Sequence, residues 1–187
     1  IYIFEPEVLS CIPYDEPCDL GRHLFPRMLN NQEPIYGISP RGYWCDVGNL
    51  ANYRRLHTDA LTGLLNVEIP GKEIADGIRI GENVDIHPSA QLSGPLFLGN
   101  GVNVKGNVRI GTGTVIGART CVDEGAQVRG SIIGNGSYLG PNASVMDCIL
   151  GSEYRIAQDE TVRGRAFIES VYYETPEPTV PIRREIP

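Results

Sequence analysis

Residues 96–122 read LFLGNGVNVKGNVRIGTGTVIGARTCV, and every sixth position of this stretch, starting from Leu98, is aliphatic. The same period extends in both directions from it. Before the first irregularity the series comprises Ile80, Ile86, Leu92, Leu98, Val104, Ile110, Ile116, Val122 and Val128. Two five-residue steps, Val128–Ile133 and Val145–Leu150, interrupt it, and its later members are Ile133, Leu139, Val145, Leu150, Ile156, Val162 and Ile168. A short fixed period of this kind indicates a repeat architecture.

Two further positions follow the same period. The residue after the aliphatic one is often glycine, as at Gly81, Gly99, Gly111, Gly117, Gly134, Gly140 and Gly151. The residue two before it is small or aliphatic, as at Val84, Ala90, Leu96, Val102 and Val108. Neither an amphipathic helix nor an alternating strand produces this combination. The pattern predicts a parallel β-solenoid in which each hexapeptide forms a short strand and a tight turn. Glycine would serve positions that need positive φ or a close backbone approach.

The hexapeptides resemble the left-handed β-helix family, in which three hexapeptides form one triangular coil. This resemblance implies a mainly β fold with about five coils. The left hand is implied by the resemblance alone, since parallel crossovers are normally right-handed. At the two five-residue steps we expect the coil to tighten or its register to be repaired. Because each coil alone buries little apolar surface, stability should come from the stacking of neighbours.

The residues before the repeats follow a different pattern. Apolar residues recur there at helical spacing, and turn-forming residues separate short runs typical of β-strands. Asp19 is a suitable N-cap for a helix, and Gly63 is a suitable stop after another. The elements expected here are a strand over 1–4, a turn and short helix over 5–9, a helix over 20–29, two strands over 34–39 and 42–47, and a helix over 50–61.

Composition narrows the classes of partner. The chain has 187 residues and a net charge of −7, with a sequence pI near 5.0, which argues against nucleic acid or an anionic membrane surface as a partner. No apolar run reaches the length of a membrane span. The sequence starts at Ile1 without a leader-like segment, so we expect it to be part of a longer protein.

Cysteine usage favours a reducing compartment. The five cysteines are Cys11, Cys18, Cys45, Cys121 and Cys148. Their odd number and the absence of a C-x-x-C motif argue against a disulfide framework or a zinc site. We expect reduced and mostly buried thiols in a cytoplasmic protein, with Cys45 singled out because of its neighbours in the motif described next.

The run GYWCDVG at 42–48, followed by Tyr53 and by Asp59-Ala60-Leu61, resembles the end of the catalytic domain of sugar-1-phosphate nucleotidyltransferases. Segments 1–4, 19–29 and 68–74 are similar to the same family. The likeness is greatest to mannose-1-phosphate guanylyltransferases, which carry a C-terminal β-helix. The expected organisation is a remnant of an α/β nucleotidyltransferase domain at 1–63, a connector at 64–77, the β-helix at 78–168, and an extended tail or linker at 169–187.

The resemblance implies a reaction in which a sugar phosphate attacks the α-phosphate of a nucleoside triphosphate. It assigns Asp46 as one of two aspartates that ligate Mg²⁺, an ion that favours a few carboxylates plus substrate phosphates. From the residues alone, a turn or cap aspartate at the start of segment 47–63 is the favoured interpretation of Asp46. The family's glycine-rich nucleotide loop is absent, so no catalytic or nucleotide-binding residue is assigned and we expect this chain alone to be inactive. Arg41 and Lys72 are candidates for substrate contact, with ordinary solvated charges as the alternative.

The implied product of the complete enzyme is a nucleotide-activated sugar. GDP-mannose from GTP and mannose-1-phosphate is favoured, and a thymidylyl- or uridylyltransferase acting on glucose-1-phosphate is the runner-up. The β-helix would serve oligomerisation or regulation, making the protein a homo-oligomer.

Two other classes stay open. One is a structural assembly module without catalysis. The other is a hexapeptide-repeat acyltransferase, for which His87 is the histidine of the repeats. A zinc site with three converging imidazoles is excluded, because His23 and His57 lie outside the repeats.

Overall fold

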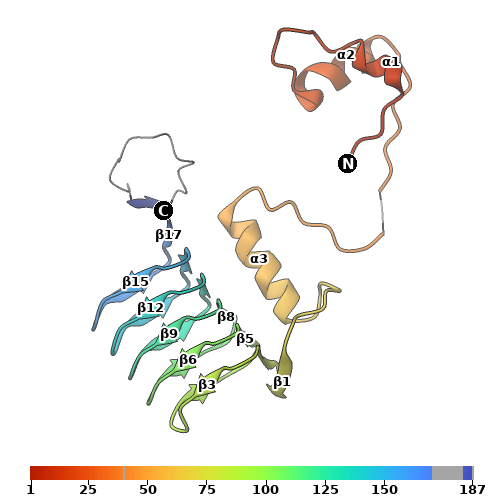
Figure 1. The fold of residues 1–187 in the computed structure, drawn as a ribbon. Helices are drawn as coiled ribbons and strands as arrows, with labels where there is room; N and C mark the ends of the chain where they lie inside the picture. Colours follow the sequence, from red (N-terminus) through yellow and green to blue (C-terminus); the bar gives the residue numbers. More distant parts are fainter. Residues whose placement is uncertain (40, 170–182, 187) are drawn as a thin grey trace. The chain divides into compact units, whose positions relative to one another are not determined.

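The computed structural model describes residues 1–39, 41–169 and 183–186 (Figure 1). The chain separates into two compact units, Ile1–Gly42 and Tyr43–Pro187. The first holds α1 (Pro6–Leu9), η1 (Leu20–Leu24) and α2 (Phe25–Asn30). The second holds α3 (Leu50–Leu61) and the whole solenoid.

The hexapeptide region forms three parallel sheets that face one another around a common core. Sheet A contains β1 (Lys72–Ala75), β2 (Ile78–Ile80), β5 (Leu96–Leu98), β8 (Thr114–Ile116), β11 (Ile132–Ile133), β14 (Ile149–Leu150), β17 (Ala166–Glu169) and β18 (Arg183–Ile186). Sheet B contains β3 (Asp85–Ile86), β6 (Asn103–Val104), β9 (Cys121–Val122), β12 (Tyr138–Leu139) and β15 (Arg155–Ile156), stacked in order in Figure 1. Sheet C contains β4 (Gln91–Leu92), β7 (Arg109–Ile110), β10 (Gln127–Arg129), β13 (Ser144–Met146) and β16 (Thr161–Arg163).

The aliphatic positions of the repeat point into the core, as the period predicts. In sheet A, Leu98 pairs with Ile116, and Ile116 pairs with Ile133 in parallel register. Each of the three is at most 1% exposed. Stacking therefore buries this position of sheet A in successive coils, from Ile80 to Leu150. The expected fold class, a mainly β protein built on a left-handed parallel β-helix of about five coils, is confirmed.

Where a glycine follows the aliphatic residue, it allows close approach between coils. A Cβ added to Gly117 would lie 2.6 Å from the amide nitrogen of Asn135 in the next coil. Positive φ occurs at other turn positions, among them Gly101 with φ +67. The two roles that the sequence assigned to one glycine column are thus divided between two columns.

The five-residue steps shorten the corner between sheets C and A. Ile132 pairs with Val115 and Ile149 pairs with Ile132, so the strand register survives the loss of one residue at each corner. A third short step follows Val162, because Phe167 takes the inward position opposite Leu150. The expectation that Ile168 continues the core column is wrong: Ile168 is 39% exposed.

Antiparallel strands cover both ends of sheet A. β1 pairs with β2 at one end, and β18 pairs with β17 at the other. Paired edges remove a template for aggregation. The segment 169–187, interpreted from the sequence as a tail or linker, lies mostly outside the described residues. Within it, 183–186 are described and form β18.

The helices predicted before the repeats are confirmed, but the strands predicted there are wrong. The Asp19 carboxylate accepts a hydrogen bond from the Arg22 amide at 2.7 Å and caps η1. Leu24 and Met28 are buried. Segments 1–4, 34–39 and 42–47 are not strands. A strand needs ladder partners for its backbone groups, and no neighbouring strand supplies them among the described residues.

Helix α3 packs against the outward face of sheet A. Asn49 caps it by accepting a hydrogen bond from the Asn52 amide at 2.8 Å, and Gly63 follows with φ +76. Leu50 and Tyr53 pack on a buried outward-facing cluster of Ile132, Ile149 and Ala166. The compact unit therefore begins at Tyr43, so α3 groups with the β-helix rather than with residues 1–42. No helix in the described part is long and apolar enough to cross a membrane.

Candidate functional site

The loop at 43–49, which contains the W-C-D-V-G motif, is tied to α3 at three points along the helix. The Tyr43 hydroxyl donates to the Asp59 carboxylate at 2.5 Å. The Arg55 guanidinium donates to the Cys45 sulfur at 3.3 Å. Nearer the start of the helix, the Asn52 side-chain amide donates to the Asp46 carbonyl oxygen at 2.7 Å. The loop therefore runs back along the helix that follows it.

The bond between Tyr43 and Asp59 changes the acidity of the phenol. Donation to the carboxylate raises the pKa of Tyr43 to about 12, so the hydroxyl stays protonated at physiological pH. A protonated phenol keeps donating to Asp59. This contact therefore fastens the start of the loop and provides no base.

Asp46 presents its carboxylate to solvent. Its main-chain carbonyl is held by Asn52, whereas the carboxylate lies over Gly48, where an added Cβ would be 3.4 Å from Oδ2. Within the described ranges, no hydrogen-bond donor reaches that carboxylate. Its lone pairs are therefore available to a cation, and the cap is made by Asn49 instead. The alternative that Asp46 caps the helix is not what the structure shows.

The described residues do not make up a metal site by themselves. In the part of the chain that the structure describes, no three His, Cys, Asp or Glu side chains come together to hold a metal. Mg²⁺ is commonly held by one or two carboxylates, with waters and substrate phosphates completing the shell. Asp46 has the chemistry of one such ligand, and the other ligands would come from elsewhere.

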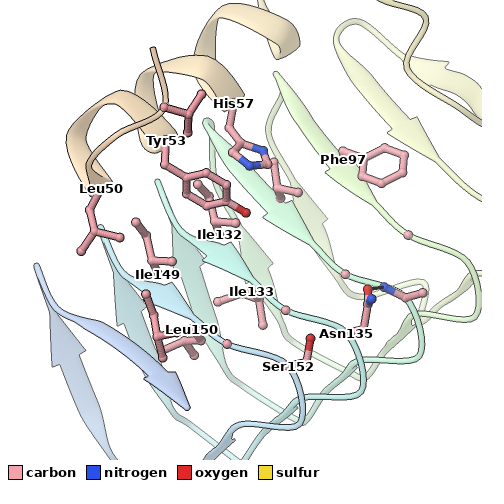
Figure 2. A pocket seen from close by; sticks show the side chains of 18 of the residues that line it. Leu50, Tyr53, His57, Phe97, Ile132, Ile133, Asn135, Ile149, Leu150 and Ser152 are labelled. Atoms are coloured by element: carbon pink, nitrogen blue, oxygen red, sulfur yellow. Dashed lines mark hydrogen bonds between the residues drawn. The ribbon is translucent and has the colours of Figure 1, made fainter. Parts of the chain in front are cut away.

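A groove of about 900 Å³ lies between α3 and sheet A (Figure 2). Its sheet side carries outward-facing apolar residues, including Phe97, Ile132 and Ile149, and its helix side carries Tyr53 and His57. Among the described residues that line it there is no lysine, arginine or carboxylate. Burial also lowers the pKa of His57, so the imidazole is neutral near pH 7. An uncharged apolar groove is unsuited to a triphosphate.

Neither Lys72 nor His87, two other candidates named from the sequence, joins Asp46 in the described part of the chain. Arg41 belongs to the N-terminal unit. Lys72 begins β1 opposite Ile80, and no hydrogen bond or ion pair joins it to the loop among the described residues. His87 accepts at Nδ1 from the Ser89 amide and lies 2.8 Å from the Ser89 hydroxyl. It therefore has a local role in a solenoid turn.

The thiols are free, as expected, but their burial was wrongly anticipated. Only Cys148 is buried, whereas Cys11 is exposed and Cys18, Cys45 and Cys121 are half-buried. Cys121 and Cys45 lie on strand and loop surfaces instead of in the core.

Sequence reasoning missed the side chains that hold the motif. Asn52 was within reach of a prediction, since it stands three residues after the Asn49 cap. Arg54 was not: its guanidinium donates to the main-chain carbonyl of Asp147 at 2.7 Å. The acceptor is a main-chain carbonyl 93 positions away, so the residue types at the two positions do not indicate the contact.

Comparison with known proteins bears on both parts of the chain. Residues 1–63 match the family model described as "Nucleotidyl transferase". Residues 72–171, just over half of the chain, match the one described as "GMPPB C-terminal domain". The chain belongs to the sugar-1-phosphate nucleotidyltransferase family. In this chain the match to the nucleotidyltransferase model precedes the match that covers the β-helix.

Individual relatives differ in the sugar and nucleotide that their names give. A UTP–glucose-1-phosphate uridylyltransferase of Synechocystis is 34% identical over 82% of this chain and 40% of its own length. A mannose-1-phosphate guanyltransferase of Eremothecium gossypii is 34% identical over 50% of this chain and 25% of its own length. The nucleotidyltransferase chain thus spans less than half of either relative.

Comparison with solved structures gives partial alignments at low similarity. A perosamine N-acetyltransferase from Caulobacter crescentus aligns with a TM-score of 0.40 and 16% identity, covering 49% of this chain and 52% of that one. Similarity at that level does not bear on function.

Proposed function

We propose that the chain is the C-terminal part of an enzyme that makes a nucleotide-activated sugar, with GDP-mannose formed from GTP and mannose-1-phosphate. In the reaction an oxygen of the sugar phosphate forms a bond to the α-phosphorus of the triphosphate. The bond between the α- and β-phosphates breaks, and pyrophosphate leaves. The observation that carries the proposal is the free Asp46 carboxylate in a loop fastened to α3, within a family match that covers both parts of the chain.

Asp46 would hold Mg²⁺ in the complete enzyme, together with groups outside this chain. When bound, the ion supplies neutralisation of phosphate charge. The residues of this chain have supporting tasks: Asn52 fixes the backbone of Asp46, and Tyr43 and Cys45 anchor the loop to α3. In this proposal the β-helix carries α3 and serves oligomerisation or regulation.

The choice of GTP and mannose-1-phosphate is supported by the match of 72–171 to the GMPPB C-terminal domain. A second candidate pair, UTP and glucose-1-phosphate, is favoured by the Synechocystis relative, which matches more of the chain than the guanyltransferase does. Both pairs use the same chemistry at the α-phosphate. The substrates would therefore be distinguished by residues of the nucleotide-binding part.

The test compares this chain with a version extended upstream to the length of its relatives. Pyrophosphate release is measured with Mg²⁺ and with each substrate pair. We expect turnover from the extended protein only, fastest with GTP and mannose-1-phosphate, and a loss of at least about 100-fold for Asp46→Asn. Preference for UTP and glucose-1-phosphate would select the second candidate. An extended protein inactive with both pairs would leave an assembly module as the function.

A further inference from the structure

The contacts that dock α3 on the β-helix gather near the end of the helix that follows Asp46. Leu50 and Tyr53, in its first turns, pack on the Ile132 and Ile149 cluster of sheet A. Farther along, His57 points into the groove, with Phe97 on the opposite side (Figure 2). The helix is therefore held most closely at the end that carries the candidate metal ligand.

Arg54 adds a directional contact to this docking. Its guanidinium reaches the carbonyl oxygen of Asp147, at the shortened corner between sheets C and A. The carbonyls on either side are used by the solenoid, since Met146 accepts from the Gly164 amide and Cys148 accepts from the Ile132 amide. Asp147 itself has φ +55, a conformation fixed by the corner. Arg54 thus bonds to an acceptor that the repeat geometry holds in place.

Helix α3 also constrains the backbone of Asp46. Asn52 stands two residues before Arg54, within one helical turn, and donates to the Asp46 carbonyl at 2.7 Å. Backbone hydrogen bonds make one turn of an α-helix rigid on this scale. A shift of α3 on sheet A would therefore displace Asn52 and, with it, the backbone of Asp46. Metal ligands tolerate displacements of only about 0.5 Å.

We propose that Arg54 is a positioning residue, which couples the β-helix to the metal-binding geometry of Asp46 through α3. This proposal rests on the proposed role of Asp46 as a cation ligand. It assigns the β-helix a part in the reaction that needs no contact with substrate. A solenoid corner fixes Arg54, Arg54 fixes the helix, and the helix fixes the backbone from which the Asp46 carboxylate extends.

The experiment uses the upstream-extended protein and compares Arg54→Ala, Arg54→Lys and a control, Arg109→Ala, which alters an exposed arginine of sheet C. Mn²⁺ binding is followed by the loss of the free-ion signal in electron paramagnetic resonance, and kcat and KM are measured separately. Because supporting partners of a metal ligand typically contribute 10- to 100-fold in affinity, we expect Arg54→Ala to weaken Mn²⁺ binding about 10-fold. The kcat should fall and the KM for the sugar phosphate should change little.

Conservative variants separate positioning from folding. Arg54→Lys keeps a cationic donor and should recover part of the Mn²⁺ affinity, which keeps the test usable if Arg54→Ala does not fold. Asp147→Gly keeps the acceptor carbonyl and suits the positive φ, so it should bind Mn²⁺ as the parent protein does. Loss of affinity in Asp147→Gly would mean that the aspartate charge attracts Arg54, and would overturn the proposed geometry.

The controls also distinguish the two proposals. If Asp46→Asn leaves Mn²⁺ affinity unchanged, the metal role of Asp46 fails and the coupling fails with it. If Asp46→Asn weakens Mn²⁺ binding while Arg54→Ala behaves like Arg109→Ala, only the positioning role is overturned. A raised KM for sugar phosphate with unchanged kcat and Mn²⁺ affinity would instead place Arg54 in substrate binding, against the proposal.

Discussion

Adjacent isoleucines of β11 offer a matched test of how the fold is stabilised. Ile133 faces the solenoid core and is 1% exposed, whereas Ile132 faces α3 and is 6% exposed. Replacing either by alanine removes the same three carbon atoms, with a transfer cost of about 2.4 kcal/mol at about 0.8 kcal/mol per carbon. What differs is the ability of the surroundings to close the cavity.

The cavity left by Ile133→Ala cannot close, because Ile116 and Leu150 above and below it are fixed by parallel strand pairing. We expect a loss of about 3–4 kcal/mol in the free energy of unfolding, since the cavity term adds to transfer. At Ile132 the neighbour is a helix beside an open groove, which can settle toward the sheet. The expected loss there is close to the transfer cost alone, about 2–2.5 kcal/mol.

Equilibrium unfolding in urea, followed by far-ultraviolet circular dichroism, measures both losses. The midpoint should fall more for Ile133→Ala, with an unchanged slope for both variants. A loss for Ile132→Ala equal to or larger than that for Ile133→Ala would refute the reasoning. It would mean that α3 is as rigidly embedded as a strand of the solenoid.

Three further predictions concern the repeat. Gly117→Ala should lower the free energy of unfolding by about 2–3 kcal/mol in urea titrations, since the added methyl group would collide with backbone of the next coil; a neutral result would contradict the close approach. Phe167→Ala should cost about 2 kcal/mol and Ile168→Ala less than about 1 kcal/mol, because Phe167 occupies the last inward position; the reverse order would restore an unbroken six-residue period. The Tyr138 hydroxyl donates to the Asp123 carboxylate at 2.6 Å, and this bond lowers the pKa of that carboxyl in the folded state. The bond therefore contributes to the free energy of unfolding above the unfolded pKa of about 3.9, and this contribution is lost as pH falls through the lower folded pKa. Thermal unfolding across pH should therefore show a gap between the parent and Tyr138→Phe at pH 7 that closes in acid, and a gap independent of pH would show that Asp123 takes no part.

The solenoid could be predicted from the sequence because its determinant is local and repeated. Each inward aliphatic residue indicates its own position in a coil, and nine such residues in one register leave little freedom in assigning the strands. The prediction fails at Ile168, where a third short corner coincides with an aromatic residue at the inward position. Counting six residues from Val162 therefore selects Ile168, the neighbour of the residue that faces the core.

The candidate site was predictable in part. The motif around Asp46 was found through family resemblance, and the helix after it through its spacing and caps. The contact of Arg54 ends on a main-chain carbonyl, which every residue has, so residue types do not reveal it. The strands expected at 1–4, 34–39 and 42–47 depend on neighbours, and a strand's own sequence does not show whether a partner stands beside it.

The placement of α3 bears on how such proteins can be recombined. The family models divide the chain between residues 63 and 72, whereas the compact unit begins at Tyr43. A chimera joined at the family boundary would set the α3 of one enzyme on the outer face of another's solenoid, mismatching Leu50 and Arg54 with their partners. A join placed before Tyr43 would transfer the helix, the Asp46 loop and the solenoid together. The exchangeable module is therefore larger than the β-helix and includes a piece of the neighbouring domain.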